Sequence, residues 1–324
     1  MVSLLWNQRE ARLRAGWRVA LFLLATGVAS TALSGPGRRL LGGLLPVVYA
    51  NVVEVGVLVL LVAVLLWLAA RWLDHRPIAD YGFHLSRAWW LDLGFGLALG
   101  AALLTGVYAL ALAMGWLTVT DTLVGPPGQP FVAAILADIL VVAGIACWEQ
   151  TVYRGYLIKN LAEGLTGRVL GARLAAVIAV LLPAVVFGLG HASNPGATTV
   201  STVNTMVFGV LFGVAYVLTG ELALALGLHF AWDFGQGFGF GRSGDAASLG
   251  AFLVTGEGDP SARLWTGWPY GVEGGLLGTV AFVVGFVLIA VWVRFRRGTV
   301  RLPSSLAQPP IHAPGRATVP ARHR

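Results

Sequence analysis

Long apolar stretches recur along the whole chain, and they constrain its fold more than any other feature. An α-helix rises about 1.5 Å per residue, so about 20 apolar residues cross the roughly 30 Å hydrocarbon core of a bilayer. Eight stretches approach or exceed that length: residues 17–34, 45–69, 89–114, 131–157, 173–191, 199–218, 221–240 and 272–293. The sequence therefore predicts an all-α, polytopic membrane protein with about eight transmembrane helices.

The composition supports this prediction. Of the 324 residues, 57% are hydrophobic and only 11% are charged, whereas about 25% of a typical soluble domain is charged. No small-residue cleavage site closes the first apolar stretch and further stretches follow it, so we interpret it as a membrane span and not as a cleaved signal. The single cysteine, Cys147, excludes an internal disulfide and a cysteine-based zinc site.

The basic net charge of +7 raises the question of a nucleic-acid partner, but membrane topology explains it. With a cytoplasmic amino terminus and eight spans, all but four of the 22 basic residues fall in cytoplasmic segments, the exceptions being Arg38, Arg39, Arg242 and Arg263. This is the positive-inside distribution. We expect a multi-pass cell-membrane protein with both termini in the cytoplasm and no nucleic-acid partner. The Arg-, Ala- and Gly-rich composition suggests a GC-rich genome and hence a bacterial inner membrane.

Changes in composition divide the chain into four regions. Residues 1–75 hold two spans with a basic start, and residues 76–240 hold the polar motifs discussed below. Residues 241–297 are predicted to form a Gly-rich outer loop, which carries Asp245, Glu257, Asp259 and Glu273, followed by the last span. The Arg- and Pro-rich tail, 298–324, is predicted to be disordered. Glycine pairs inside spans, Gly96 with Gly100 and Gly209 with Gly213, are spaced to let helices approach closely.

Ionisable side chains interrupt three of the apolar stretches. They are Glu149 and Arg154, His191, and His229 with Asp233. A charged residue at the centre of a membrane helix costs roughly 2.5–3.5 kcal/mol on insertion scales, so such residues usually pair or face water. This cost indicates a functional site.

Helical geometry separates the roles of these residues. At 100° per residue, Gln150 and Arg154 lie about 40° apart on one face, whereas Glu149 points about 140° away from Arg154. Glu149 is therefore free for chemistry, and Arg154 is predicted to be a structural brace. His229 and Asp233 are four residues apart and project from one stripe of their helix.

The residues around these positions resemble three motifs of the CPBP family, which contains CAAX-processing type II prenyl proteases and bacterial bacteriocin-immunity (Abi) proteins. The segments "EQTVYR" (149–154), "FGLGH" (187–191) and "HFAWD" (229–233) are similar, in order and spacing, to E-E-x-x-x-R, F-x-x-x-H and H-x-x-x-N/D. The resemblance extends from about Arg76 to Phe240.

The resemblance implies an eight-helix intramembrane endopeptidase whose site lies in a water-filled cavity open to the cytoplasm. It implies that Glu149 and His191 activate the hydrolytic water, while His229 and Asp233 stabilise the oxyanion. Arg154, Gln150 and Phe187 would support these groups. The implied substrate is a membrane protein or a lipid-anchored peptide, reached among membrane lipids; in a bacterium an Abi-like role is favoured over the processing of a CAAX protein.

Two positions differ from the family motif. Residue 150 is Gln where the motif has Glu, and residue 233 is Asp where well-known members have Asn. The changes offset each other in formal charge, and an ionised Asp233 cannot donate a hydrogen bond to an oxyanion. We hypothesise that Arg154 or a bound cation neutralises Asp233. The set Glu149, His191, His229 and Asp233 would also suit a divalent metal such as zinc.

Other readings of the sequence are kept open. No H-E-x-x-H surrounds any of the six histidines, and "GRSG" and "GEGD" imitate serine and aspartyl intramembrane protease motifs only by chance in the Gly-rich region. A proton-coupled transporter also needs buried ionisable groups. A non-catalytic immunity or scaffold protein could keep the same fold.

The predicted span boundaries conflict with a shared site. They put Glu149 near the inner end of its helix and His191 near the outer end of the next helix, about 20 Å apart in depth by helical rise. Chemistry requires both residues at one level, so the motifs predict that one of these boundaries is displaced.

Overall fold

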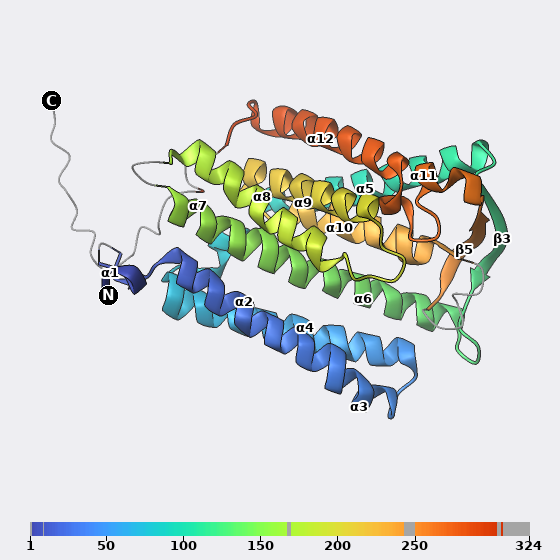
Figure 1. The fold of residues 1–324 in the computed structure, drawn as a ribbon, viewed down its shortest axis with the longest axis horizontal. Helices are drawn as coiled ribbons and strands as arrows, with labels where there is room; N and C mark the ends of the chain where they lie inside the picture. Colours follow the sequence, from blue (N-terminus) through green and yellow to red (C-terminus); the bar gives the residue numbers. More distant parts are fainter. Residues whose placement is uncertain (1, 9, 167–169, 243–249, 303–305, 307–324) are drawn as a thin grey trace.

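The computed structural model describes residues 2–8, 10–166, 170–242, 250–302 and 306. Its helices lie side by side in an elongated bundle (Figure 1). Helices α2, α3 and α4 form one edge, α12 forms the opposite edge, and a small sheet lies at one end. The predicted tail, 298–324, and the predicted loop residue Asp245 lie largely outside the described residues.

Seven helical segments in the described residues are long and apolar enough to cross a membrane. They are α2 (Ala15–Ala32) continued by η1 (Leu33–Gly37) and α3 (Arg38–Gly42); α4 (Val47–Leu68) with η2 (Ala69–Asp74); α5 (Arg87–Ala113); α6 (Phe131–Gln150) with η4 (Thr151–Ile158) and α7 (Lys159–Leu165); α8 (Ala172–Gly190); α9 (Thr199–Thr219); and α12 (Leu276–Arg297). The prediction of an all-α polytopic membrane protein is confirmed.

The predicted span over residues 221–240 differs from the other seven. It forms α10 (Ala223–Phe234) of 12 residues, continued for 5 residues by the π-helical η5 (Gly235–Gly239), which is shorter than the roughly 20 residues of a full span. Its apolar side chains, among them Leu224, Leu228 and Trp232, are buried inside the bundle. The apolar run therefore reflects burial in protein. Helix α10 still carries the chain from one end of the bundle toward the other. The start of α2, at Ala15, and the end of α12, at Arg297, therefore lie at the same end of the bundle (Figure 1).

The helix that carries Glu149 continues beyond its predicted end. The segment α6–η4–α7 reaches Leu165, whereas the sequence prediction ended at residue 157. Glu149 therefore lies about as far from the Leu165 end of its helix as His191 lies from the Ala172 end of α8. The two residues are consequently at a similar depth. The predicted difference in depth is thus wrong, and its source is the inner boundary of one helix.

A three-stranded sheet takes up part of the predicted outer loop. Strand β3 (Leu117–Val124) pairs antiparallel with β5 (Phe252–Gly258), and β4 (Phe240–Arg242) pairs parallel with β5. Short turns follow between β5 and α12: η7 (Pro260–Ala262), α11 (Arg263–Thr266) and η8 (Val272–Gly274). Asp138 of α6 accepts a hydrogen bond of 2.8 Å from the Ala251 N–H and thereby ties this region to the bundle.

Glycines let α5 and α10 pack backbone against backbone. A Cβ at Gly96 would lie 2.3 Å from the carbonyl oxygen of Leu224, and one at Gly227 would lie 2.3 Å from that of Leu93. Similarly, a Cβ at Gly209 of α9 would lie 3.0 Å from Ala184 of α8. The predicted role of these glycines in close helix packing is confirmed, and the α5–α10 contact fixes the helix that carries His229 and Asp233.

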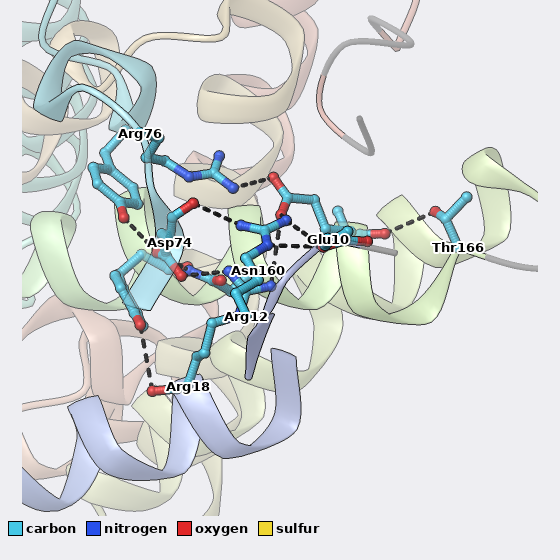
Figure 2. Close-up of polar contacts among 11 residues, drawn as sticks. Glu10, Arg12, Arg18, Asp74, Arg76, Asn160 and Thr166 are labelled. Carbon is cyan, nitrogen blue, oxygen red and sulfur yellow. Dashed lines mark hydrogen bonds and ion pairs between the residues drawn. The ribbon is translucent and has the colours of Figure 1, made fainter. Parts of the chain in front are cut away.

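A cluster of polar side chains, which we call the N-terminal network, lies at the end of the bundle opposite the sheet. Figure 2 shows its contacts. The amino-terminal α1 (Val2–Leu5) and β1 (Trp6–Asn7) precede the network, which joins β2 (Arg12–Leu13) and α2 to η2, η3 (Ile78–Tyr81) and α7. Three arginines face three carboxylates: Arg12, Arg18 and Arg76 with Glu10, Asp74 and Glu163.

The bonds of the N-terminal network are almost entirely buried. Glu163 lies 3.1 Å from Arg12 and 3.7 Å from Arg18 and also pairs with Arg76, while its side chain is only 3% exposed. Asp74 pairs with Arg18 and accepts hydrogen bonds from Tyr81 and, at 3.0 Å, from Asn160. Buried charges of this kind are tolerated because each is paired.

We predict that Glu163→Gln destabilises the protein strongly. Removing one charge from a buried ion pair leaves its partners uncompensated and typically costs about 3–5 kcal/mol. Glu10, 28% exposed in its side chain, is the matched control, and Glu10→Gln should cost less than about 1 kcal/mol. Reversible denaturation in micelles measures both free energies of unfolding; equal losses would contradict this account of the network.

We also predict that Gly227→Ala separates α5 from α10. The new methyl group would overlap the backbone of α5, and overpacking typically costs about 1–3 kcal/mol. Gly94, on the same helix α5, has open space at its Cβ position, so Gly94→Ala should leave the thermal unfolding midpoint unchanged or slightly raised. Unchanged stability of Gly227→Ala would show that the two helices are not in close contact.

Candidate active site

A cavity of about 480 Å³ lies among α6, α8, α9, α10 and the segment before α12. Four predicted site residues line it together: Glu149, His191, His229 and Asp233. Phe187, predicted to support them, lines it as well. The structure thus brings side chains from three helical segments, α6, α10 and the end of α8, to one level of the bundle.

His229 is the centre of the polar contacts in this cavity. Its Nε2 lies 3.0 Å from the Asp233 Oδ2 and 3.6 Å from the Glu149 Oε2. On the other side of the ring, Nδ1 lies 2.9 Å from the amide nitrogen of Gln150. An amide nitrogen only donates, so Nδ1 accepts and the proton of the neutral imidazole is on Nε2. His229 therefore presents an N–H toward Asp233 and Glu149.

His191 is held in the opposite tautomer. Its Nδ1 lies 2.8 Å from the carbonyl oxygen of Phe187, one turn earlier on α8. A carbonyl oxygen only accepts, so Nδ1 carries the proton and Nε2 of the neutral ring is left as an acceptor. One imidazole of the cavity can therefore accept a proton while the other donates a hydrogen bond.

The carboxylate of Glu149 is buried and incompletely paired. The residue is 7% exposed, and its Oε2 has no hydrogen-bond partner among the described residues. Because burial of an unpaired polar atom is costly, this oxygen is suited to a hydrogen-bonding ligand in the cavity, such as water.

Arg154 is buried between aromatic rings and does not neutralise Asp233. Its guanidinium lies 4.5 Å from the ring centre of Phe187 and 4.8 Å from that of Phe212, and Nη2 donates to the Gly209 carbonyl at 3.3 Å. No ion pair joins Arg154 to Asp233 in the described part of the chain. This part of the charge hypothesis is wrong, because two aromatic rings enclose the guanidinium and His229 occupies the position beside Asp233.

The four predicted metal ligands are not arranged as a metal site. Within the described residues, no group of three or more His, Cys, Asp or Glu side chains is arranged to hold a metal ion. In its neutral tautomer His229 directs the Nε2 proton toward Asp233, so this nitrogen is not available as a ligand, whereas Nε2 of His191 is free to accept. No chemical step below passes through a metal.

Glu273 is a cavity residue that the sequence analysis placed in an outer loop. It belongs to η8, lines the cavity, and accepts a hydrogen bond of 2.9 Å at Oε1 from the Trp232 indole N–H. Burial, together with the nearby Asp233 charge, raises the pKa of Glu273 to about 7. A lone acidic residue just before an apolar stretch was the only sequence signal, and it does not indicate into which space the side chain folds.

The position of the cavity brings two sequence-based expectations into conflict. The α8–α9 connection and the segment before α12, which border the cavity, lie toward the sheet end of the bundle (Figure 1). The positive-inside distribution puts the opposite end, with Ala15 and Arg297, in the cytoplasm. These connections would then face outward, whereas the resemblance implies a cavity open to the cytoplasm.

Comparison with known families finds a match that covers the middle of the chain. The family model described as type II CAAX prenyl endopeptidase Rce1-like matches residues 130–235, about a third of the chain. The matched segment contains every predicted site residue and excludes Glu273. No curated protein and no solved structure matches the chain. This matched segment, which supplies most of the helices around the cavity, is similar to the type II CAAX prenyl endopeptidases.

Proposed function

We propose that this protein hydrolyses a peptide bond of a membrane-embedded substrate with a water molecule activated by Glu149 and His191. The observation that carries the proposal is the Glu149 Oε2, which has no hydrogen-bond partner among the described residues, in one cavity with two imidazoles of opposite tautomer. A hydrolase needs a proton acceptor for the water and a donor for the oxyanion, and this set supplies both.

The proposed reaction follows from these proton positions. Glu149 accepts a proton from the water, whose oxygen attacks the scissile carbonyl carbon, while Nε2 of His191 accepts the second O–H of the water as a hydrogen bond. The carbonyl π electrons move to the oxygen, and the Nε2–H of His229, which donates to Asp233 in the resting site, is shared with the resulting oxyanion in a three-centre hydrogen bond. The oxyanion then re-forms the carbonyl, the C–N bond breaks, and protonated Glu149 gives its proton to the leaving amine.

Asp233 has a different role from the one the resemblance implies. Its Oδ2 accepts from the Nε2–H of His229 at 3.0 Å, so it orients the ring and favours the tautomer that donates. As a carboxylate it stabilises the site through His229 and not as a direct oxyanion donor. Gln150 acts from the other side of the ring, because its amide N–H keeps the proton off Nδ1.

The proposed substrate is a membrane protein or a lipid-anchored peptide, and nucleic acid has no part in the function. A peptide bond has to enter a buried cavity, and membrane lipids surround the helices that enclose it. We place the protein in a bacterial inner membrane with both termini in the cytoplasm, on the distribution of basic residues.

The zinc hypothesis makes a separate prediction of its own. It requires stoichiometric metal in the purified wild-type protein and its loss in His229→Ala. Elemental analysis of both samples tests it without reference to peptidase activity.

Two other functions compete with hydrolysis. A transporter requires polar groups that continue through the bundle; in the described residues, no hydrogen bond or ion pair joins the cavity residues to the N-terminal network. A non-catalytic immunity or scaffold protein would need neither the unpaired Glu149 oxygen nor two fixed tautomers. These observations favour the peptidase.

We predict that Glu149→Gln abolishes peptide hydrolysis. Loss of a general base typically lowers a rate by about 10²- to 10⁴-fold. The measurement is cleavage of farnesylated CAAX-type peptides by the protein in lipid nanodiscs. It is accompanied by a comparison of membrane proteomes, in which an uncleaved substrate should accumulate in the variant.

Glu221→Gln is the matched control, because Glu221 pairs with His84 at 2.7 Å and does not line the cavity. It should keep wild-type activity. Equal hydrolysis by wild type and Glu149→Gln would exclude the proposed mechanism, and ion flux in proteoliposomes that depends on Glu149 would favour the transporter.

A further inference from the structure

Glu273 enters the cavity from outside the segment that matches the family model. It precedes α12, whereas the match ends at residue 235. Its side chain faces the same space as Glu149, His191 and Asp233. A group from a region outside the matched segment is suited to distinguish this protein's substrate from those of other family members.

The segment that carries Glu273 is held firmly in place. Asn204 donates from Nδ2 to the carbonyl oxygens of Glu273, at 2.8 Å, and Gly275, at 3.0 Å. The Glu273 N–H donates to Gln236 at 3.3 Å. Gly271 has φ 121°, which other residues rarely adopt. Glu273 is therefore preorganised by the backbone around it, as a binding group should be.

The cavity has more acidic than basic groups. Three carboxylic residues line it, Glu149, Asp233 and Glu273, and neither lysine nor arginine is among the described residues that do so. Asp233 faces His229, and Glu149 has an unpaired oxygen suited to the reacting water. Within the described part of the chain, Glu273 has only the neutral Trp232 indole as a side-chain hydrogen-bond donor. Since a carboxylate has about four lone-pair positions, it can accept further hydrogen bonds.

We propose that Glu273 forms a subsite that selects a substrate with a positively charged side chain beside the scissile bond. This inference rests on the proposed peptidase function and adds its substrate class. A lysine or arginine side chain would supply the charge that the cavity lacks and would donate to the free positions of the Glu273 carboxylate.

The test uses quenched farnesylated CAAX-type peptides that differ only in one residue near the scissile bond, Lys, Arg, Gln or Met. Wild type should cleave the Lys or Arg peptide with kcat/KM about 10- to 100-fold higher than the Gln peptide, the range expected of one hydrogen bond to a charged group. Glu273→Gln should reduce this preference to less than about 3-fold.

Glu257→Gln removes the same charge from an exposed position on β5 and should keep the full preference. The proposal is overturned if wild type shows no preference for Lys or Arg at any position, or if Glu273→Gln retains the preference. If Glu273→Gln does not fold, the wild-type preference alone decides between these results.

A measurement of peptide binding distinguishes failure of this inference from failure of the proposed function. If wild type cleaves none of the peptides, the hydrolysis proposal fails. The affinities of the labelled Lys and Gln peptides for wild type and Glu273→Gln then test the subsite by fluorescence polarisation. A Lys preference that requires Glu273 supports it, and equal affinities for the two peptides overturn it.

Discussion

The high cost of an unpaired polar atom in an apolar interior governs how this bundle is organised. In a helical membrane protein, backbone groups are satisfied within each helix, so the remaining cost lies with side chains. Here many of the buried ionisable side chains gather in two places, the cavity around His229 and the N-terminal network (Figure 2). Close α5–α10 packing through Gly96 and Gly227 makes the first cluster possible, because it fixes the helix that carries His229.

The two histidines of the cavity illustrate how neighbouring groups assign chemistry to identical side chains. A backbone carbonyl determines which nitrogen of His191 accepts, and an amide N–H determines which nitrogen of His229 donates. Replacement of a motif Glu by Gln150 therefore does more than remove a charge. A carboxylate at that position would accept from Nδ1, and the proton would leave the nitrogen that faces Asp233 and Glu149.

Much of the fold and most of the site could be predicted from the sequence, because both depend on local patterns. The lengths of the apolar stretches identified the membrane helices. The order and spacing of the three motifs identified Glu149, His191, His229 and Asp233 as neighbours. The end of the Glu149 helix, the sheet and Glu273 could not be predicted in this way. They depend on contacts between distant segments, such as the Trp232 indole with Glu273 and Asp138 with Ala251, and no single apolar or polar period encodes them.

The N-terminal network has a consequence for how the protein is synthesised. Arg12 and Arg18 lie at the beginning of the chain, whereas their shared partner Glu163 emerges from the ribosome only when about half of the 324 residues have been translated. Until then, among the described residues, Arg12 has only Glu10 and Arg18 only Asp74 as carboxylate partners. The network can thus be completed only after α7 has been made, and the chain secures its own amino terminus fully late in biogenesis.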